Sequence, residues 1–165
     1  SAIERYKYQK KTTLILKPRM DNRYAGGEIT SHSGWGVAAG LVETGQDILD
    51  RVAESDEIIH AVALDEAFMV PGAADALVWL YRQGVSILVS TLDISATGMV
   101  FDEIKEMLPW ATRVEKCTAV CTVCGADAHY THRRGEYVGE IQVGGEETYE
   151  PRCFTHHVAV NERDK

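Results

Sequence analysis

The sequence predicts an α/β fold, in which helices flank a mainly parallel sheet and a small metal-binding module follows toward the C-terminus. Short apolar runs alternate with stretches of helical periodicity, which is typical of parallel strands joined by crossover helices. After Cys121 the helical period disappears, and the chain becomes polar and rich in Gly, Cys and His. We therefore expect an α/β domain over residues 1–120 and a separate zinc-binding module over residues 121–165.

The first elements expected are a helix, a strand and a long loop. Residues 2–11 carry apolar side chains on one helical face and several basic residues on the other. Residues 12–17 are a short apolar run rich in strand formers, which predicts a buried strand that Pro18 ends. The polar, Gly-rich stretch from residue 20 to residue 45 predicts a loop, and loops of this length are usually functional or mobile.

The central part of the chain predicts a helix, a strand and a second helix. Apolar residues recur at helical spacing over residues 47–55, and residues 58–64 form a continuous apolar run that predicts a buried strand. Pro71 is expected to open the next helix, because proline favours the first helical turn. The apolar face expected for that helix consists of Ala74, Leu77, Val78 and Tyr81, and Gly84 is its expected stop.

Three more elements are expected before the cysteine-rich module. Residues 85–91 are rich in β-branched residues and predict a strand. Residues 100–108 have helical periodicity up to Pro109. Polar and apolar residues alternate over 113–120, which predicts a fourth, half-buried strand.

The chain is acidic, with 17 Lys and Arg against 25 Asp and Glu among 165 residues and a formal net charge of −8. Proteins that bind nucleic acid through its phosphates need a basic surface, so we expect no nucleic-acid partner. No apolar run approaches the roughly 18 residues that span a bilayer, so we expect no membrane association. A small phosphorylated ligand remains compatible with the charge, because a local pocket can be basic on an acidic protein.

Two pairs of metal-ligating residues carry the strongest local signal. Two residues separate Cys121 from Cys124, and two separate Cys153 from His156. Such pairs fit a tetrahedral zinc site, in which each pair forms a tight turn known as a knuckle. Because four protein ligands fill the coordination sphere, we predict a structural rather than a catalytic zinc ion.

Two neighbouring residues are alternatives to this ligand set. Cys117 could compete as a ligand, although it falls in the strand predicted at 113–120 and is expected to be a core thiol. His157 could replace His156, although it breaks the two-residue spacing. The crowding of the cysteines favours a metal site in a reducing compartment over a disulfide framework.

The strand predicted at 58–64 runs directly into Asp65 and Glu66. An apolar strand that ends in acidic residues is similar to the Walker B pattern, in which a strand-end acid helps to hold Mg²⁺ beside nucleotide phosphates. Many strands end in solvated acidic residues, so the pattern alone leaves both interpretations open. If the segment stays extended, successive side chains point opposite ways, and the two carboxylates are expected to serve different partners.

A second polar segment is expected at the same edge of the sheet. Residues 17–23 follow the strand predicted at 12–17 and contain both Asp21 and Arg23. Because the carboxyl ends of parallel strands meet at one edge, this segment could bring an acid and a phosphate-binding guanidinium beside Asp65.

In combination, these motifs resemble those of the type II thymidine kinases, a zinc-containing, cytosolic and tetrameric family. The resemblance covers most of the chain and rests on the order and spacing of the motifs. The matching segments are Lys17-Pro18, Asp21-Asn-Arg-Tyr24, Ser31-His32, Val62-Ala-Leu-Asp-Glu-Ala67, Leu92-Asp93, Lys116–Cys124, Tyr130-Thr131, Val143-Gly-Gly-Glu-Glu-Thr-Tyr149 and Cys153.

The resemblance implies a P-loop NTPase fold of the RecA-like type, with residues 1–120 as the nucleotide-binding domain. It implies transfer of the γ-phosphate of ATP to the 5′-hydroxyl of thymidine or a close analogue, giving dTMP. A structural zinc ion and Mg²⁺ with ATP are the implied cofactors, and a cytoplasmic homotetramer is the implied assembly. Glu66 matches the catalytic base that takes the proton from the 5′-hydroxyl, and Asp65 matches the acid that supports Mg²⁺.

The resemblance also implies the remaining site residues. In the family, backbone groups of a loop called the lasso bind the base, and the zinc module anchors both ends of that loop. The residues implied to bind the nucleotide are Asp21, Asn22, Arg23, Asp65, Ala67 and Phe68. Those implied to bind the nucleoside are Met69, Leu92, Phe101, Thr131, Tyr149 and the lasso residues Glu140, Ile141, Gln142, Val143 and Gly144.

The sequence departs from the family pattern in three ways. It contains no G-x-x-x-x-G-K-[ST] loop, and it begins inside the expected first helix, so we expect the loop to precede Ser1. Phe68 stands where the family usually has Gln, and Ala96 stands where it places an aromatic residue near the base. Both changes bear on strict thymidine specificity.

Two functions of other classes compete with the kinase. One is a catalytically inactive homologue, a zinc-stapled nucleotide-binding or scaffolding domain that lacks the phosphate loop. The coding sequence upstream of Ser1 would distinguish this homologue from a kinase. The other is a zinc-ribbon nucleic-acid module on an unrelated α/β domain, and the acidic charge counts against it.

Overall fold

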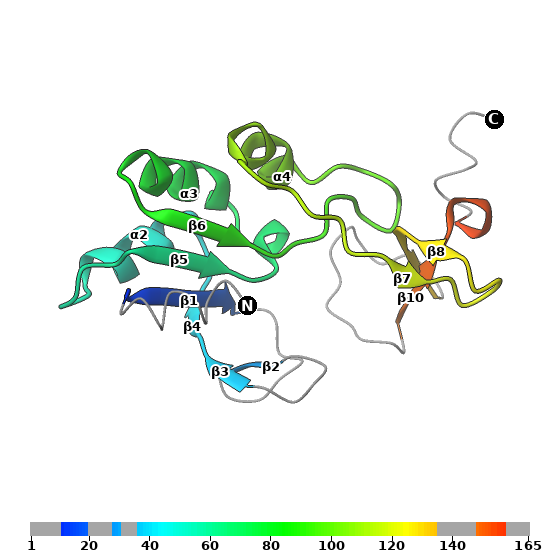
Figure 1. Ribbon diagram of the computed structural model, residues 1–165, viewed down its shortest axis with the longest axis horizontal. Helices are drawn as coiled ribbons and strands as arrows, with labels where there is room; N and C mark the ends of the chain where they lie inside the picture. The colour runs from blue at the N-terminus through cyan, green and yellow to red at the C-terminus, as the bar shows by residue number, and fades with distance from the viewer. Residues whose placement is uncertain (1–10, 20–27, 31–35, 135–147, 158–165) are drawn as a thin grey trace. The chain divides into compact units, whose positions relative to one another are not determined.

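The computed structural model describes residues 11–19, 28–30, 36–134 and 148–157 (Figure 1). The described residues as far as Leu92, together with Asp102–Trp110, form a first compact unit. Asp93–Phe101 and the described residues from Ala111 onward form a second. The helix predicted at 2–11 lies almost entirely outside the described residues.

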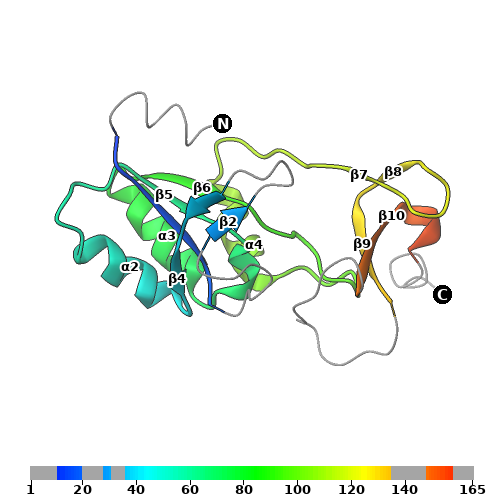
Figure 2. The ribbon, with the colours of Figure 1, turned by 90° about the horizontal axis from the view of Figure 1, so that it is seen from below.

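The first unit is built on a parallel sheet of four strands in the order β4-β1-β5-β6 (Figure 2). The strands are β1 (Thr13–Pro18), β4 (Gly40–Val42), β5 (Ala61–Leu64) and β6 (Ser86–Val89). All four residues of β5 are buried, as expected for an interior strand of a parallel sheet. The predicted α/β fold with a mainly parallel sheet is therefore confirmed.

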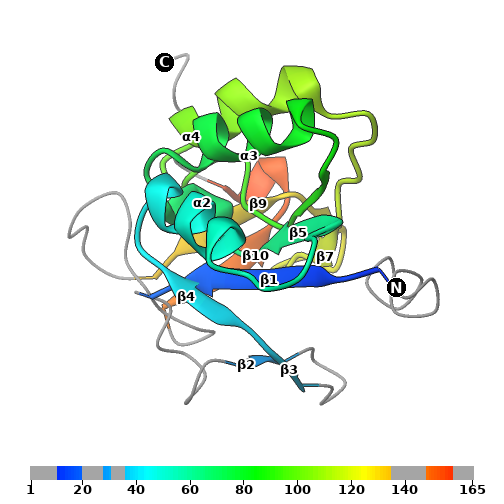
Figure 3. The same cartoon turned by 90° about the vertical axis from the view of Figure 1, so that its left-hand side faces the viewer.

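Three helices lie on one face of this sheet, namely α2 (Gly45–Ala53), α3 (Ala73–Arg82) and α4 (Asp102–Met107) (Figure 3). The core beneath them is aliphatic and includes Leu16 from β1, Ile48 from α2 and Leu77 from α3, each no more than 1% exposed. Burial of such side chains contributes about 1.5–3 kcal/mol each to folding.

Helices α2 and α3 meet through a backbone contact that requires glycine. The Gly45 amide donates a 2.8 Å hydrogen bond to the carbonyl of Pro71. A Cβ atom at Gly45 would lie 2.0 Å from the carbonyl oxygen of Gly72, closer than any side chain tolerates. The absence of a side chain at residue 45 therefore allows the backbone at the start of α2 to approach the backbone at the start of α3 this closely.

The N-terminus of α3 is capped by a side chain from another helix. Its N-cap, Gly72, has φ of 76° and provides no side chain to accept from the first amides. Glu103 on α4 supplies both acceptors, with 2.6 Å to the Gly72 amide and 2.7 Å to the Ala74 amide. A carboxylate also interacts favourably with the positive end of the helix dipole, so Glu103 joins α4 to α3.

Several predicted elements are shorter or shifted. β5 begins at Ala61 rather than residue 58, because Ile58 is 81% exposed and lies outside the sheet. Helix α3 begins at Ala73, after Pro71, because Gly72 adopts a left-handed conformation as N-cap. The buried face of α3 is also rotated from the predicted one, since Tyr81 is 41% exposed. The buried residues of α3 are Ala73, Ala74, Ala76, Leu77 and Leu80.

Two predictions of segment type were wrong in part. The expected loop between residues 20 and 45 contains β2 (Glu28–Thr30), β3 (Gly36–Ala38) and β4, because even three-residue segments pair where a partner strand is adjacent. The strand predicted at 113–120 is reduced to β7 (Ala119–Val120), and all of residues 113–120 are exposed. The alternating pattern therefore produced a strand only at Ala119–Val120, where β8 is available as a partner.

The second unit contains two short antiparallel pairs. β7 pairs with β8 (Asp127–Ala128), and β9 (Tyr130–Arg133) pairs with β10 (Tyr149–Arg152). Three 3₁₀ turns complete the described structure, η1 (Ala67–Met69) and η2 (Leu108–Trp110) in the first unit and η3 (Phe154–His156) in the second.

No helix in the described part of the chain combines the length and the apolar character that a membrane span requires.

The cap of α3 gives a stability prediction. Glu103→Ala should lower the free energy of unfolding by about 1–2 kcal/mol, because the first amides of α3 lose their acceptors. Urea denaturation followed by circular dichroism measures the change. Glu106→Ala on the exposed face of α4 is the matched control and should leave stability within about 0.5 kcal/mol of the unsubstituted protein. Equal stability of the two variants would contradict the capping role.

Candidate functional site

Acidic and hydroxyl side chains meet where two neighbouring parallel strands end. Asp65 follows β5 and Ser90 follows β6, and the Ser90 hydroxyl donates a hydrogen bond to Oδ1 of Asp65. The Ser90 amide also donates to the carbonyl of Leu64 at 3.0 Å, which continues the β5–β6 ladder to this point. The carboxylate of Asp65 is thus oriented at the edge of the sheet where α/β proteins bind ligands.

Glu66 adopts a left-handed backbone conformation, with φ of 50° and ψ of 44°. Among the described residues it is the one non-glycine residue with positive φ, a conformation that costs about 1–2 kcal/mol for a side chain with a Cβ. The expectation that Asp65 and Glu66 alternate as in an extended strand is therefore wrong. β5 ends at Leu64, and the backbone turns at Glu66 into η1.

The turn after Glu66 is fixed by the end of β6. The Ala67 amide donates to the carbonyl of Ser90 and the Phe68 amide to the hydroxyl of Thr91, each at 3.3 Å. Ala67 and Phe68 are buried, whereas Met69 is half-buried. Five consecutive residues predicted for the site, 65–69, therefore lie in one tight turn.

The other residues predicted for the nucleotide and nucleoside belong to one or other of the two units or fall outside the described residues. Leu92 is 38% exposed and follows the same strand end as Ser90. Phe101 is half-buried in the second unit, in which Thr131 and Tyr149 also lie. Asp21, Asn22 and Arg23 fall outside the described residues, as do the predicted lasso residues Glu140, Ile141, Gln142, Val143 and Gly144.

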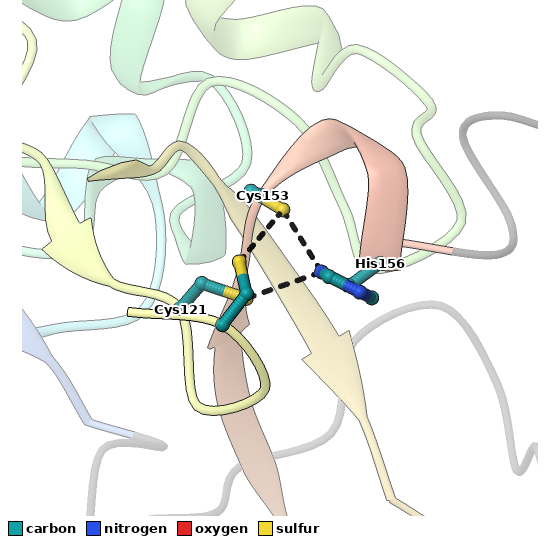
Figure 4. A group of neighbouring side chains, drawn as sticks. Cys121, Cys153 and His156 are labelled. Carbon is teal, nitrogen blue, oxygen red and sulfur yellow. Dashed lines mark hydrogen bonds between the residues drawn. The ribbon is translucent and has the colours of Figure 1, made fainter. Parts of the chain in front are cut away.

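Three thiols and one imidazole converge in the second unit. The ligand atoms of Cys121, Cys124, Cys153 and His156 all lie within 4.8 Å of one another. Between the two knuckles, Cys124 Sγ lies 3.8 Å from Cys153 Sγ, and Cys121 Sγ lies 3.8 Å from His156 Nδ1. Cys153 Sγ lies 3.2 Å from His156 Nδ1, and Figure 4 shows the labelled side chains pointing toward one another.

The two 3.8 Å separations between the knuckles fit a tetrahedral zinc site. A zinc ion about 2.3 Å from sulfur and about 2.0–2.1 Å from nitrogen places its ligand atoms roughly 3.6–3.8 Å apart. Three thiolates and one imidazole are also the donors that zinc prefers. The cluster could therefore hold a zinc ion, and all four of its residues would be ligands.

Each pair of ligands is presented by a tight turn. In the first, the Cys121 amide donates to the carbonyl of Ala126 at 2.8 Å, and Gly125 takes a φ of 75° that favours glycine. In the second, Cys153 precedes η3, and the His156 amide donates to the Cys153 carbonyl at 3.1 Å. Burial opposes ionisation of Cys121, but nearby backbone amides, led by that of Cys153, lower the pKa of its thiol to about 6.

The two alternative ligands lie elsewhere. Cys117 is exposed and is not among the clustered residues, so the expectation of a core thiol in a strand was wrong. The segment around it does not join a sheet, which is why its side chain stays at the surface. His157 is fully buried, and its Nε2 donates to the carbonyl of Thr131 at 2.9 Å. Its ring therefore contacts β9 instead of the cluster.

Thr131 and Tyr149 lie on the two strands of one ribbon. Thr131 is opposite Pro151, and Tyr149 is opposite Arg133. Residues directly opposite share a face and residues two apart along a strand do too, so Thr131 and Tyr149 are diagonal neighbours on one face. The Arg134 amide donates to the carbonyl of Thr148 at 2.8 Å and extends the ribbon by one step.

Sequence patterns did not identify two residues that the structure makes prominent. Ser90 orients Asp65, and its only signal is its position at the end of a predicted strand. Glu150 accepts hydrogen bonds from three side chains, and its signal is the charge alternation of Glu150-Pro-Arg152 on a strand beside a predicted ligand. Charge alternation alone is typical of strands exposed to solvent, so it does not show whether the charged side chains form a buried hydrogen-bond network.

Comparison with known proteins agrees with this arrangement. A family model described as thymidine kinase matches residues 1–157. A thymidine kinase from Thermococcus kodakarensis is 34% identical over 171 residues, which cover 97% of this chain and 86% of that protein. Both matches extend across the strand-end acids and the Cys/His cluster.

The metal cluster gives a direct prediction. Protein purified without added zinc should contain about one zinc ion per chain by elemental analysis, because four suitable ligands already converge. Cys153→Ser should lose the zinc and the ordered fold of the second unit, whereas Cys117→Ser should keep both. Full zinc retention by Cys153→Ser would refute the assignment, and loss of zinc from Cys117→Ser would change the ligand set.

Proposed function

Since the chain belongs to the thymidine kinase family, we propose that it transfers the γ-phosphate of ATP to the 5′-hydroxyl of thymidine and releases dTMP. The family membership makes the protein a kinase. The observation that supports the proposal best is the turn at Asp65 and Glu66, which presents two consecutive carboxylates at the ligand-binding edge of a parallel sheet.

Phosphoryl transfer requires an oriented nucleophile and compensation of phosphate charge. In our proposal Asp65 would hold the Mg²⁺ that accompanies ATP, since carboxylate oxygens are the ligands that Mg²⁺ prefers. When bound, the ion neutralises charge on the phosphate oxygens. The hydrogen bond from Ser90 restricts the rotation of the Asp65 carboxylate before any ligand arrives.

Glu66 is the proposed general base. A nucleoside 5′-hydroxyl is a weak nucleophile, so a carboxylate within hydrogen-bond distance can orient it and accept its proton. The left-handed backbone of Glu66 supports this role, because strained conformations of non-glycine residues are concentrated at active sites.

The zinc-binding unit is proposed to bind the nucleoside. Thr131 and Tyr149 share a face of the β9–β10 ribbon, and the segment between these strands contains Glu140–Gly144, the residues proposed to bind the base through their backbone. A bound zinc ion would cross-link the two knuckles beside this ribbon and reduce its freedom. We also propose that Asp21, Asn22 and Arg23 contact the nucleotide and that the enzyme is a cytoplasmic homotetramer.

A nucleoside panel tests the proposed reaction. Full-length protein with ATP and Mg²⁺ should phosphorylate thymidine at the 5′-position, and mass spectrometry of the product should identify dTMP. Phe68 and Ala96 differ from the usual family residues, so deoxyuridine and deoxycytidine are the informative competitors. Binding of nucleotide without phosphorylation of any nucleoside would instead support the inactive, scaffolding homologue.

The role of Glu66 gives a kinetic prediction. Glu66→Gln keeps the shape of the side chain and removes the base, so kcat should fall by about 10²–10⁴-fold with much smaller changes in KM for thymidine and ATP. Steady-state kinetics on the full-length enzyme measure both constants. Asp65→Asn should instead raise the Mg²⁺ concentration that gives half the maximal rate.

The matched control for Glu66→Gln is Glu106→Gln, an exposed carboxamide substitution on α4 in the same unit, which should leave kcat unchanged. If Glu66→Gln kept a nearly normal kcat, Glu66 would be a solvated acid of the turn and the proposed base would be wrong.

A further inference from the structure

The carboxylate of Glu150 is the centre of a side-chain network in the second unit. Oε2 accepts from the Thr122 hydroxyl at 3.0 Å and from Nη2 of Arg134 at 2.8 Å. Oε1 accepts from Nε of Arg152 at 2.9 Å and also from its Nη2. Glu150 is 9% exposed, and the Arg152 guanidinium, followed by that of Arg134, lowers the pKa of its carboxyl to about 2.

These partners come from three different segments. Thr122 lies between the ligands Cys121 and Cys124 in the first knuckle, Arg134 follows β9, and Arg152 lies on β10 beside the ligand Cys153. The Thr122 amide also donates to the carbonyl of Pro151 at 3.2 Å. Glu150 therefore joins the metal knuckles to both strands of the ribbon through charge-assisted hydrogen bonds, which are the strong ones.

The network occupies the face of the ribbon opposite to the proposed nucleoside face. Glu150 pairs with His132, and Arg152 pairs with Tyr130, whereas Thr131 and Tyr149 alternate to the other side. A second link supports the same face, because the buried ring of His157 lies edge-on to His132 with centroids 5.7 Å apart. Both links thus end on side chains of the face opposite to Thr131 and Tyr149.

A two-stranded ribbon needs such support. An isolated pair of strands is marginally stable in water, and a one-residue slip in register would exchange its two faces. Thr131 and Tyr149 lie on different strands, so their relative position depends on the register between β9 and β10. A misplacement of about 1 Å at a binding or reacting centre can cost 10²-fold in rate.

We propose that Glu150 is a positioning residue for the nucleoside, acting by locking the register of the β9–β10 ribbon to the metal knuckle through Thr122. The proposal rests on the function proposed above, in which Thr131 and Tyr149 bind thymidine. Glu150 acts through these residues, since it lies on the opposite face of the ribbon.

The test separates nucleoside binding from metal retention. In full-length protein, Glu150→Gln keeps the side-chain shape but replaces one accepting carboxylate oxygen with an amide group that donates. That group then faces side chains that are themselves donors. The dissociation constant and KM for thymidine should rise about 10-fold or more, while kcat changes less than about threefold. Zinc content should stay at one ion per chain. Calorimetry, steady-state kinetics and elemental analysis give these values.

The matched control is Glu115→Gln. Glu115 is an exposed carboxylate paired with Arg113 at 2.8 Å, and its substitution should change neither thymidine binding, nor kcat, nor zinc content.

Thr122 provides a milder variant in case Glu150→Gln folds poorly. Thr122→Val removes the hydroxyl at constant size and should weaken thymidine binding in the same direction, whereas Thr122→Ser should restore it. The effects of Thr122→Val and Glu150→Gln should be less than additive in the double variant, because both substitutions disrupt the same Thr122–Glu150 hydrogen bond.

The outcomes are distinguishable. Unchanged thymidine binding by both Glu150→Gln and Thr122→Val would overturn the inference alone, and so would binding that falls only in proportion to lost zinc. Unsubstituted protein that binds no thymidine would overturn the proposed function and this inference with it.

Discussion

Three sulfur atoms and one imidazole nitrogen can share a zinc ion only if two distant knuckles meet within a few ångströms. The knuckles are separated in the chain by residues 125–152, yet their ligand atoms lie within 4.8 Å of one another. In the described part of the second unit the strands are two to four residues long, and several apolar side chains are exposed. A metal cross-link at this cluster would supply the stability that a core of this size does not.

The short strands of this unit are arranged around the metal knuckles. β7 leads into Cys121, β10 leads into Cys153, and the antiparallel β9–β10 ribbon follows from where these ends must meet. The links from Thr122 to Glu150 and from His157 to Thr131 extend the constraint from the ligands to the ribbon. Hydrogen bonds to a charged carboxylate are directional, so they transmit position as well as stability.

The first unit is stabilised by its parallel sheet and aliphatic core. Its parallel strands carry their own hydrogen bonds and bury an aliphatic core, so the carboxyl edge of the sheet can carry polar and strained residues. The left-handed backbone at Glu66 is tolerated because Ser90 and Thr91 bond the two amides that follow it. The rigid sheet therefore compensates for strain at the residues that we propose to be catalytic, a common division between scaffold and active site.

The sequence by itself determined the α/β class, the two knuckles and the strand-end position of Asp65 and Glu66. Each depends on local pattern, such as the two-residue ligand spacing or an apolar run that ends in acids, and local pattern survives without knowledge of neighbours. It also favoured Cys121, Cys124, Cys153 and His156 as ligands over two alternatives, because these four have the spacing of paired knuckles, and the structure brings the same four together.

Tertiary structure alone decided which segments pair and which side chains meet. Residues 113–120 have the pattern of a strand, yet only Ala119–Val120 pair with another strand in the described structure, whereas Gly40–Val42, within an expected loop, pairs with β1. The cap that Glu103 provides, the turn at Glu66 and the network of Glu150 join residues from separate elements. No periodicity records such contacts, because strand pairing and charge-assisted bonding depend on which surfaces folding brings together rather than on the intrinsic preference of any segment.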